Sequence, residues 1–427
     1  MFVKIKSLAK EGFFHILIGN TLTKMIAFIS SFLLARLVDK SSYAHLTSAD
    51  NMYSYIVMLY GLGMPSALLI NCTVKNEKGK NNAYLKLAFK YGSLVQIILS
   101  IGVVMYATYI ELPFPQVTQY VYILAFYPLL NHLIDTYQSY LRANLMNKEY
   151  ALASFIQTFA LFIGNVVLLK WLGTTGNVIA RYVALVITLV YLIYISKKLF
   201  DKNKVRNDLT KNEIVLFLKQ SISFLIANYF SGIMPQNEMS LVNQLIKNET
   251  VTANYKVAVM IPAQLSFVTS SIMVFFFPKI AQMKDPFEIR KKSKEIAIGT
   301  FLVVAVISLI GFLFSPFIIR LFYGDRFDDA IQLASIFWIV NGINAGFRMV
   351  PGNILPAIGE YKYNAFLSIA TCGVHFAIEY IMINNYGING VAIGSALVYL
   401  VTGIIFWAYL LRILKQRESE TFERGVN

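Results

Sequence analysis

Charged residues are scarce in this chain of 427 residues, and their scarcity excludes an ordinary soluble protein. They make up 14% of the sequence, against roughly 25% in soluble domains. Hydrophobic residues make up 57%, above the roughly 45–50% of soluble domains, and the mean hydropathy is +0.58. The sequence therefore predicts a membrane protein.

Cysteine, histidine and the short motifs of common enzymes are scarce or absent as well. The two cysteines, Cys72 and Cys372, are too few for a disulfide framework or a metal cluster, and the four histidines lack metal-ligand spacing. The chain has no P-loop, no GxSxG, no HExxH and no CxxC motif. We therefore expect neither an enzyme nor a bound cofactor or metal.

Long apolar runs, by contrast, recur along the whole chain. A helix needs roughly 20 apolar residues to cross the hydrocarbon core of a membrane. The first run follows a basic segment without a clear cleavage site, so we expect a span there rather than a signal peptide. The predicted fold is an all-α polytopic membrane protein of about twelve transmembrane helices, at residues 13–36, 43–70, 86–109, 117–141, 151–171, 177–196, 214–246, 252–279, 296–319, 330–356, 362–383 and 389–411.

The net charge of +15 is distributed unevenly between the two predicted sides of the membrane. With the N-terminus inside, the dense basic clusters fall in the inner loops, chiefly within 197–213 and 280–295. The outer loops are short and weakly basic. Because basic loops stay in the cytoplasm, both termini are predicted to be cytoplasmic. The charge indicates contact with anionic membrane lipids and not with nucleic acid.

An internal repeat divides the chain into two halves of six spans, predicted as six-helix bundles at 1–205 and 206–427. Gly173-x-x-Gly176 reappears as Gly387-x-x-Gly390, each in the outer loop before the last span of its half. Asn20 likewise reappears as Asn228. An even number of spans gives both halves the same orientation, related by an axis along the membrane normal. We expect a central cavity between them.

Ionisable residues inside spans are costly in lipid and usually face a bundle interior or a watery cavity. Four cations fall within the predicted spans: Lys24, Arg181, Lys256 and Arg348. Four acids do so as well, and they either pair with such cations or serve as ion-coupling sites: Asp50, Asp135, Glu238 and Glu379.

Polar residues form helical stripes in spans one, four, seven and ten, which correspond in the repeat. Such stripes suit a cavity that binds substrate. The simpler alternatives are that amides and hydroxyls only join helices, that Asp50 caps its span, and that Arg142 extends to the membrane surface. The stripes are Asn20, Lys24 and Ser31; Asn131, Asp135, Gln138 and Arg142; Asn228, Ser231, Pro235 and Glu238; and Asn341, Asn344, Arg348 and Pro351.

Four short segments resemble landmarks of the polysaccharide transporters in the MATE-like (MOP) superfamily, the Wzx-type O-antigen flippases. Ala35-Arg36-Leu37-Val38 before Tyr43 is similar to the exit of the family's first span. The segment 321–327, LFYGDRF, is similar to its outer turn after the ninth span. Ile358-Gly359-Glu360 and the turn at 386–390 are similar to later landmarks.

The resemblance implies a flippase that moves an undecaprenyl-diphosphate-linked oligosaccharide across the cytoplasmic (inner) membrane by alternating access. It also implies a polysaccharide polymerase and other assembly proteins as partners. A diphosphate is anionic, so buried cations such as Lys24 and Arg348 would attract it, while the amide stripes would bind sugars. With no ATP motif, we expect an ion gradient to supply the drive.

Three other functions compete with this interpretation. One is a non-transporting membrane scaffold, which the repeated polar stripes make less attractive. A multidrug exporter of the same superfamily would have a cavity of acids and aromatics that binds organic cations, and Lys24 and Arg348 argue against it. A membrane polysaccharide polymerase or glycosyltransferase would need a sizeable outer loop with paired acids. The predicted outer loops are too short for that.

Overall fold

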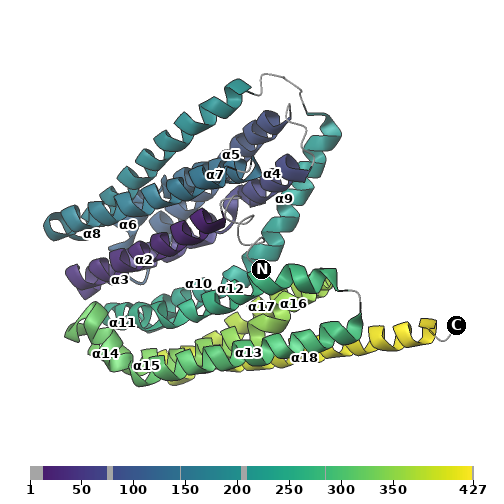
Figure 1. The fold of residues 1–427 in the computed structure, drawn as a ribbon. Coiled ribbons are helices and arrows are strands. Elements are labelled where there is room, and N and C mark those ends of the chain that lie inside the picture. Colours follow the sequence, from purple (N-terminus) through teal and green to yellow (C-terminus); the bar gives the residue numbers. More distant parts are fainter. Residues whose placement is uncertain (1–12, 75–79, 145, 203–208, 284, 426–427) are drawn as a thin grey trace. The chain divides into compact units, whose positions relative to one another are not determined.

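The computed structural model describes residues 13–74, 80–144, 146–202, 209–283 and 285–425, and nearly all of them are helical (Figure 1). No strand occurs among these residues. The predicted all-α fold is therefore confirmed. The chain forms two compact units, and the boundary between them along the sequence lies between Gln236 and Asn237.

The N-terminal unit is built from the helices before Gln236. The predicted second span is broken into two helices, α3 and α4, bent by 57° at a glycine-containing turn. Gly61, Leu62 and Gly63 there all have positive φ, a conformation that glycine adopts without steric cost. The helices are α2 (Phe13–Leu37), α3 (Lys40–Val57), α4 (Tyr60–Val74), α5 (Asn81–Tyr109), α6 (Val117–Ile123), α7 (Tyr127–Ala143), α8 (Asn147–Lys202), α9 (Lys211–Gly232) and the start of α10 (Met234–Leu241).

Helix α9 packs with the N-terminal unit, although the sequence repeat begins its second copy before this helix. Gly63 of α4 lies so close to the carbonyl of Ser221 on α9 that a side chain at residue 63 would overlap it. Phe217 of α9 also lies in the same buried core as Tyr84 of α5. The compact packing of this unit thus extends about thirty residues beyond the predicted division at 205/206.

The C-terminal unit begins at Asn237 and contains several interrupted helices. Pro262 separates two of them, as expected for a residue without a backbone N–H. Elsewhere a π-helical turn, η4, precedes Met349. The elements are the rest of α10, η1 (Val242–Ile246), α11 (Glu249–Met260), η2 (Pro262–Gln264), α12 (Leu265–Gln282), α13 (Pro286–Leu313), α14 (Ser315–Tyr323), η3 (Asp325–Ala330), α15 (Ile331–Ile343), η4 (Asn344–Arg348), α16 (Met349–Ala357), α17 (Tyr361–Tyr386) and α18 (Ile388–Gly425).

The repeated glycine motif has the same geometry in both units. Gly173 has φ 53° and ψ −135°, and Gly387 has φ 60° and ψ −141°, a region open essentially to glycine alone. Each turn folds the following helix back on the preceding one. Gly176 therefore lies against the carbonyl of Leu168, and Gly390 lies against that of Met382. The motif makes a helical hairpin, so α8 contains two of the predicted spans.

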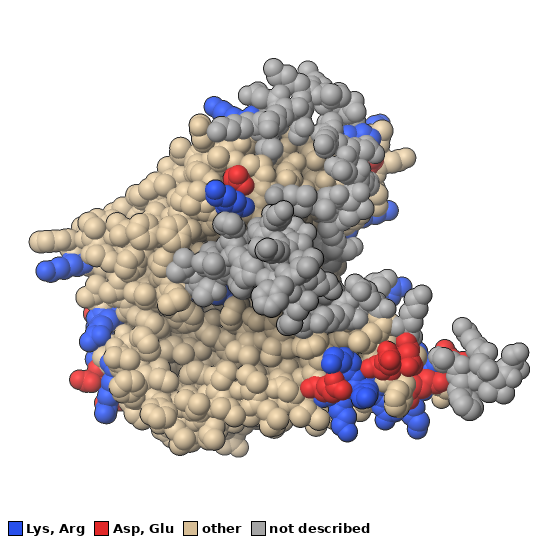
Figure 2. All heavy atoms as spheres, in the orientation of Figure 1, with Lys and Arg blue, Asp and Glu red and all other residues tan. Residues whose placement is uncertain are grey.

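The outer faces of both units suit a membrane. Seven described helical stretches are long and apolar enough to cross one, α8 counting once, and bent α3–α4 would be an eighth. Large apolar side chains such as Ile98, Val167 and Leu309 are more than half exposed, which is typical of surfaces that contact lipid. Figure 2 shows a broad uncharged surface, with charged side chains near the start of α13 and the end of α18. The chain is a multi-pass membrane protein.

Candidate functional site

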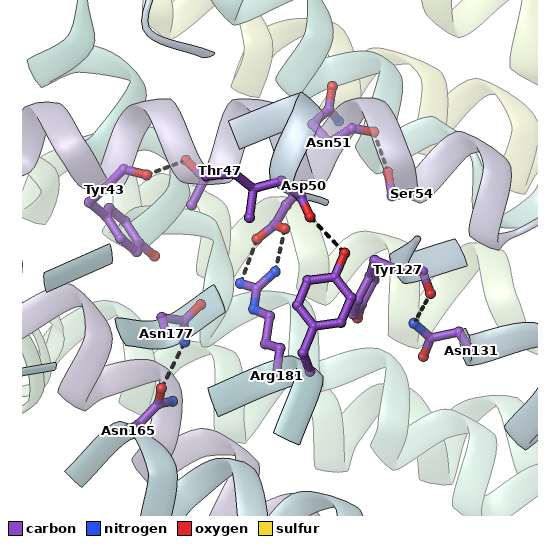
Figure 3. A network of polar contacts seen from close by, with 12 residues as sticks. Tyr43, Thr47, Asp50, Asn51, Ser54, Tyr127, Asn131, Asn165, Asn177 and Arg181 are labelled. Carbon is purple, nitrogen blue, oxygen red and sulfur yellow. Dashed lines mark hydrogen bonds and ion pairs between the residues drawn. The ribbon is translucent and has the colours of Figure 1, made fainter. Parts of the chain in front are cut away.

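An ion pair joins two of the predicted charged residues inside the N-terminal unit (Figure 3). The guanidinium of Arg181 on α8 donates from both terminal nitrogens to the carboxylate of Asp50 on α3; Nη2 to Oδ2 measures 2.8 Å. The ring of Tyr127 lies 5.9 Å from the guanidinium carbon. Paired in this fork geometry, the two side chains carry no net charge together. Arg181 is thus held by a carboxylate of its own unit.

A neutral polar cluster lies in the same unit where α2 meets the α8 hairpin. Asn165 donates to the hydroxyl of Ser30 at 2.7 Å, and Asn177 donates to the side-chain oxygen Oδ1 of Asn165 at 2.9 Å (Figure 3). All three side chains are buried. These hydrogen bonds pair polar groups that would be costly to bury alone, although Asn177 Oδ1 has no partner among the described residues. The cluster contains no titratable group.

The C-terminal unit holds a buried cluster of three titratable side chains from two helices. Glu238 comes from α10, and His375 and Glu379 lie one turn apart on α17. His375 Nε2 is 3.2 Å from Glu238 Oε1 and 3.6 Å from Glu379 Oε1. All three side chains are at least 95% buried. Because an isolated charge is expensive at such a place, these groups must share protons or a cation.

The hydroxyl of Ser395 on α18 connects the two carboxyl groups. Its oxygen lies 2.8 Å from Glu238 Oε1 and 2.9 Å from Glu379 Oε1. A hydroxyl has a single hydrogen and can donate to only one of them. The other contact therefore requires a proton on a carboxyl group or a cation that both oxygens coordinate. Two carboxylates and one imidazole could also ligate a metal ion, since their ligand atoms lie within 4.8 Å of one another.

The two glutamates differ in their hydrogen-bond partners. Glu238 accepts from the hydroxyl of Tyr255 at 2.9 Å, and its other oxygen faces Ser395, His375 and, at 3.5 Å, the Tyr399 hydroxyl. Glu379 Oε2 is buried and has no partner among the described residues. Donors stabilise a carboxylate, so Glu238 is the group equipped to carry the negative charge.

The neutral and the charged cluster occupy corresponding places in the two halves of the sequence. Ser30 and Glu238 are separated by the same offset as Asn20 and Asn228, and Asn165 and Glu379 by the same offset as Gly173 and Gly387. Ser30 and Asn165 are in direct contact, and Glu238 and Glu379 are connected through the Ser395 hydroxyl. Hydroxyl and amide groups are thus sufficient to pack this position, so packing alone does not require the acids of the C-terminal unit.

Arg348 lies inside the C-terminal unit with uncharged partners. It donates from Nε to the Thr402 hydroxyl at 3.1 Å and from Nη1 to the Asn344 side-chain oxygen at 3.2 Å. Its guanidinium carbon is 5.6 Å from the ring of Tyr399 and 5.9 Å from that of Phe406. None of these described partners is a carboxylate, which sets Arg348 apart from Arg181.

The other predicted cavity residues lie elsewhere in the two units. Lys24 on α2 and Arg142 on α7 are exposed, and Lys256 on α11 is half-buried. Arg142 lies over the ring of Tyr150. The side chains of Asn20 and Asn228 lie outside the described part of the structure.

Three polar residues of the predicted stripes make few polar contacts within the described structure. Gln138 is within 3.4 Å of the Ser154 hydroxyl, and Asn341 donates to the Phe337 carbonyl one turn earlier. Asp135 on α7 has no hydrogen bond or ion pair within the described residues.

Sequence reasoning missed His375, Ser395 and Tyr399. Two signals were present: His375 and Glu379 are spaced i, i+4, and α18 carries Ser395, Tyr399, Thr402 and Phe406 at i, i+4, i+7 and i+11, which places them on one helical face. That face contacts both the acidic cluster and Arg348.

Comparison with known proteins establishes the family. Residues 9–284 match the family described as "Polysaccharide biosynthesis protein". The chain belongs to this family. It is also similar to a putative O-antigen transporter of Shigella flexneri, with 23% identity over 199 residues, which are 46% of this chain and 46% of that protein. The match thus spans about half the length of that relative.

Two solved structures share the fold over nearly the whole chain. An inward-facing multidrug resistance MATE family transporter of the MOP superfamily has a TM-score of 0.73 and 13% identity, covering 93% of this chain and 96% of that one. The lipid II flippase MurJ, in an inward closed conformation, has a TM-score of 0.73 and 15% identity, covering 95% and 90%. The family and the superfamily fold predicted from the sequence are confirmed.

Proposed function

We propose that this protein is a flippase for an undecaprenyl-diphosphate-linked oligosaccharide, such as an O-antigen repeat unit, which it moves across the cytoplasmic membrane by alternating access. The proposal is supported by the family and by the fold that it shares with a lipid II flippase. The matched proteins are named as transporters or flippases and not as enzymes, in line with the absence of catalytic motifs.

Arg348 is the observation that carries the proposal. A cation at the centre of a membrane helix costs about 2.5–3.5 kcal/mol, and the described partners of Arg348 supply no negative charge. A diphosphate would supply it through charge-assisted hydrogen bonds. Lys24, exposed on α2, is the second cation proposed to attract the head group, while the amides of the predicted stripes would bind sugar hydroxyls.

The buried cluster of Glu238, His375 and Glu379 is proposed to couple transport to an ion gradient. Its hydrogen-bond geometry requires an extra proton or a bound cation, so loading and unloading that ion changes the local charge. The repeat partner of this cluster in the N-terminal unit is neutral. The coupling function therefore belongs to the C-terminal unit in this proposal.

A multidrug exporter remains the main competing function, since that class shares the fold. Binding an organic cation would need a free acid. Asp50, however, is paired with Arg181, and Arg348 would repel such a substrate. Asp135, or a glutamate of the buried cluster, is the acid that this alternative would have to use.

Deletion of the gene in the host, followed by analysis of lipid-linked intermediates, separates these functions. A flippase predicts complete repeat units that accumulate on the cytoplasmic side. Exported but unpolymerised units would instead indicate a polymerase. Normal surface glycan together with increased drug sensitivity would indicate an exporter and would refute the proposal.

A further inference from the structure

A cavity lies at one end of the C-terminal unit where three turns meet. These turns lead into α11, from η3 into α15, and into α18. The cavity has a volume of about 350 Å³, within the roughly 300–1,000 Å³ of small-molecule sites. In the predicted topology all three turns are outer loops. The polar residues that line it are Asn248, Thr250, Asn254, Asp329, Gln332 and Asn389.

Asn254 supplies an unsatisfied acceptor at this cavity. Its side chain is only 8% exposed, and its Oδ1 atom is buried with no hydrogen-bond partner in the described part of the chain. A buried acceptor without a partner costs about 1–3 kcal/mol. Because this oxygen has almost no accessible surface as placed, the carboxamide has to turn toward the cavity for the oxygen to accept from a ligand hydroxyl. The described residues therefore leave one hydrogen-bond acceptor beside the cavity without a donor.

The lining favours a neutral, hydroxyl-rich ligand over an anion. None of the described lining residues is Lys or Arg, and the carboxylate of Asp329 would repel a phosphate. Amide groups both donate to and accept from hydroxyl groups, and a carboxylate accepts from them. Val251, Leu333 and Ile388 add an apolar surface, against which the C–H face of a sugar ring can pack.

The turns that build the cavity are fixed by their backbone. Lys247 adopts a left-handed conformation with φ 51°, and the next residue, Asn248, caps α11 by accepting from the N–H of Val251 at 3.0 Å. Gly387 fixes the turn before Asn389. A site on such constrained turns loses little entropy when a ligand binds.

We propose that this cavity binds one or two neutral sugar residues of the transported glycan. The inference rests on the proposed function for the source of the sugar, and it deepens that function by separating recognition of the sugar from recognition of the diphosphate. The head group would contact Arg348, whereas a sugar further along the glycan would contact Asn254.

Saturation-transfer NMR on the full chain in lipid nanodiscs tests the sugar site directly. The probes are the methyl glycosides of glucose, galactose, mannose, rhamnose and N-acetylglucosamine, each with inorganic pyrophosphate as competitor. We expect at least one glycoside to bind, with about tenfold lower affinity in Asn254→Leu, which removes the acceptor at similar volume. Asn389→Ala, at an exposed lining position, should weaken binding without affecting folding.

Asn385→Ala is the matched control, because this exposed asparagine on α17 donates to the Ile381 carbonyl of its own helix and is not among the residues that line the cavity. It should bind the glycosides like the unmodified chain. The proposal is overturned if both lining variants keep full affinity, or if pyrophosphate displaces the glycosides.

A second arm of the experiment separates this inference from the proposed function. The lipid-linked repeat unit should displace the bound glycoside. Displacement by the repeat unit, together with loss of binding in the lining variants, supports both claims. The repeat unit could also fail to displace a glycoside whose binding depends on Asn254. That result would support a sugar site but refute its link to the transported glycan. Loss of the sugar site would leave the gene-deletion result unaffected.

Discussion

The same neutral substitution is predicted to have opposite consequences at the two buried glutamates of the C-terminal unit. Glu238 faces donors from Tyr255, Ser395 and His375 at 2.8–3.2 Å. Glu379 faces the same Ser395 hydroxyl at 2.9 Å, and its second oxygen has no partner among the described residues. The single hydrogen of Ser395 then points to Glu238. Glu379 fits as the protonated partner that donates to Ser395.

The expected magnitudes follow from these contacts. In Glu238→Gln the amide group turns N–H donors toward Tyr255 or Ser395 and removes the charge that these donors stabilise. Breaking a buried charged network costs about 3–5 kcal/mol of unfolding free energy. In Glu379→Gln the amide N–H replaces the carboxyl O–H as donor to Ser395 at nearly the same volume. We expect a loss of about 1 kcal/mol or less.

Two measurements check this prediction. Unfolding of the purified chain in mixed micelles compares the free energies, with Glu360→Gln, a change of a less buried ion pair with Arg417, as the control. Translocation of the lipid-linked unit into liposomes is then measured with and without an imposed proton or sodium gradient. Glu379→Gln should fold normally and lose its response to the gradient. Equal destabilisation by both substitutions, or a Glu379→Gln variant that still follows the gradient, would refute the assignment.

Further predictions concern the charged residues and the hairpin turn. Arg348→Ala and Lys24→Ala are expected to block surface glycan display without loss of the protein from the membrane, measured by glycan staining and membrane immunoblots; normal display in both would refute the anion site. Arg181→Ala leaves the Asp50 carboxylate unpaired and should lower the unfolding free energy of the N-terminal unit by about 1–3 kcal/mol. The loss stays in this range because the Asp50 side chain is 31% exposed to solvent. Adding Asp50→Ala in a double-mutant cycle should recover part of that loss. Gly173→Ala should lower the unfolding free energy by about 1–3 kcal/mol through backbone strain, whereas an alanine at the helical, open position Gly102 should not.

Hydropathy was enough to predict the helical membrane fold, because every span must satisfy its backbone internally. It could not locate the breaks inside spans. The bend at Gly61–Gly63 lies in a run that stays apolar, where Gly61, Gly63 and Pro65 mark it but hydropathy does not, and the turn at Gly173 needs only one residue of unusual backbone conformation. The repeat did mark Gly173 and Gly387, since both must be glycine for the same reason.

The site was harder to predict because its members are distant in sequence. The pairing of Asp50 with Arg181 joins residues 131 positions apart, and a single sequence contains no signal for such a contact. The four histidines lack metal-ligand spacing, so His375 was not predicted as a site residue, although Glu379 one turn later places two titratable groups on the same face of α17. The predicted cations could be named from the sequence, but only the structure distinguishes Arg181, which has a carboxylate partner, from Arg348.

Tyr399 provides a physical link between the proposed anion site and the acidic cluster. Its ring lies under the Arg348 guanidinium, and its hydroxyl is 3.5 Å from Glu238 Oε1. Ser395 and Thr402 flank it on the same face of α18 and contact the acidic cluster and Arg348, respectively. A change of charge at Glu238 or Glu379 therefore acts on the side chains that position Arg348. An anionic head group at Arg348 and an ion at the cluster would each contact side chains on the same face of α18. Each binding event would therefore change the contacts available to the other. Such a difference in contacts is what energetic coupling between two sites requires.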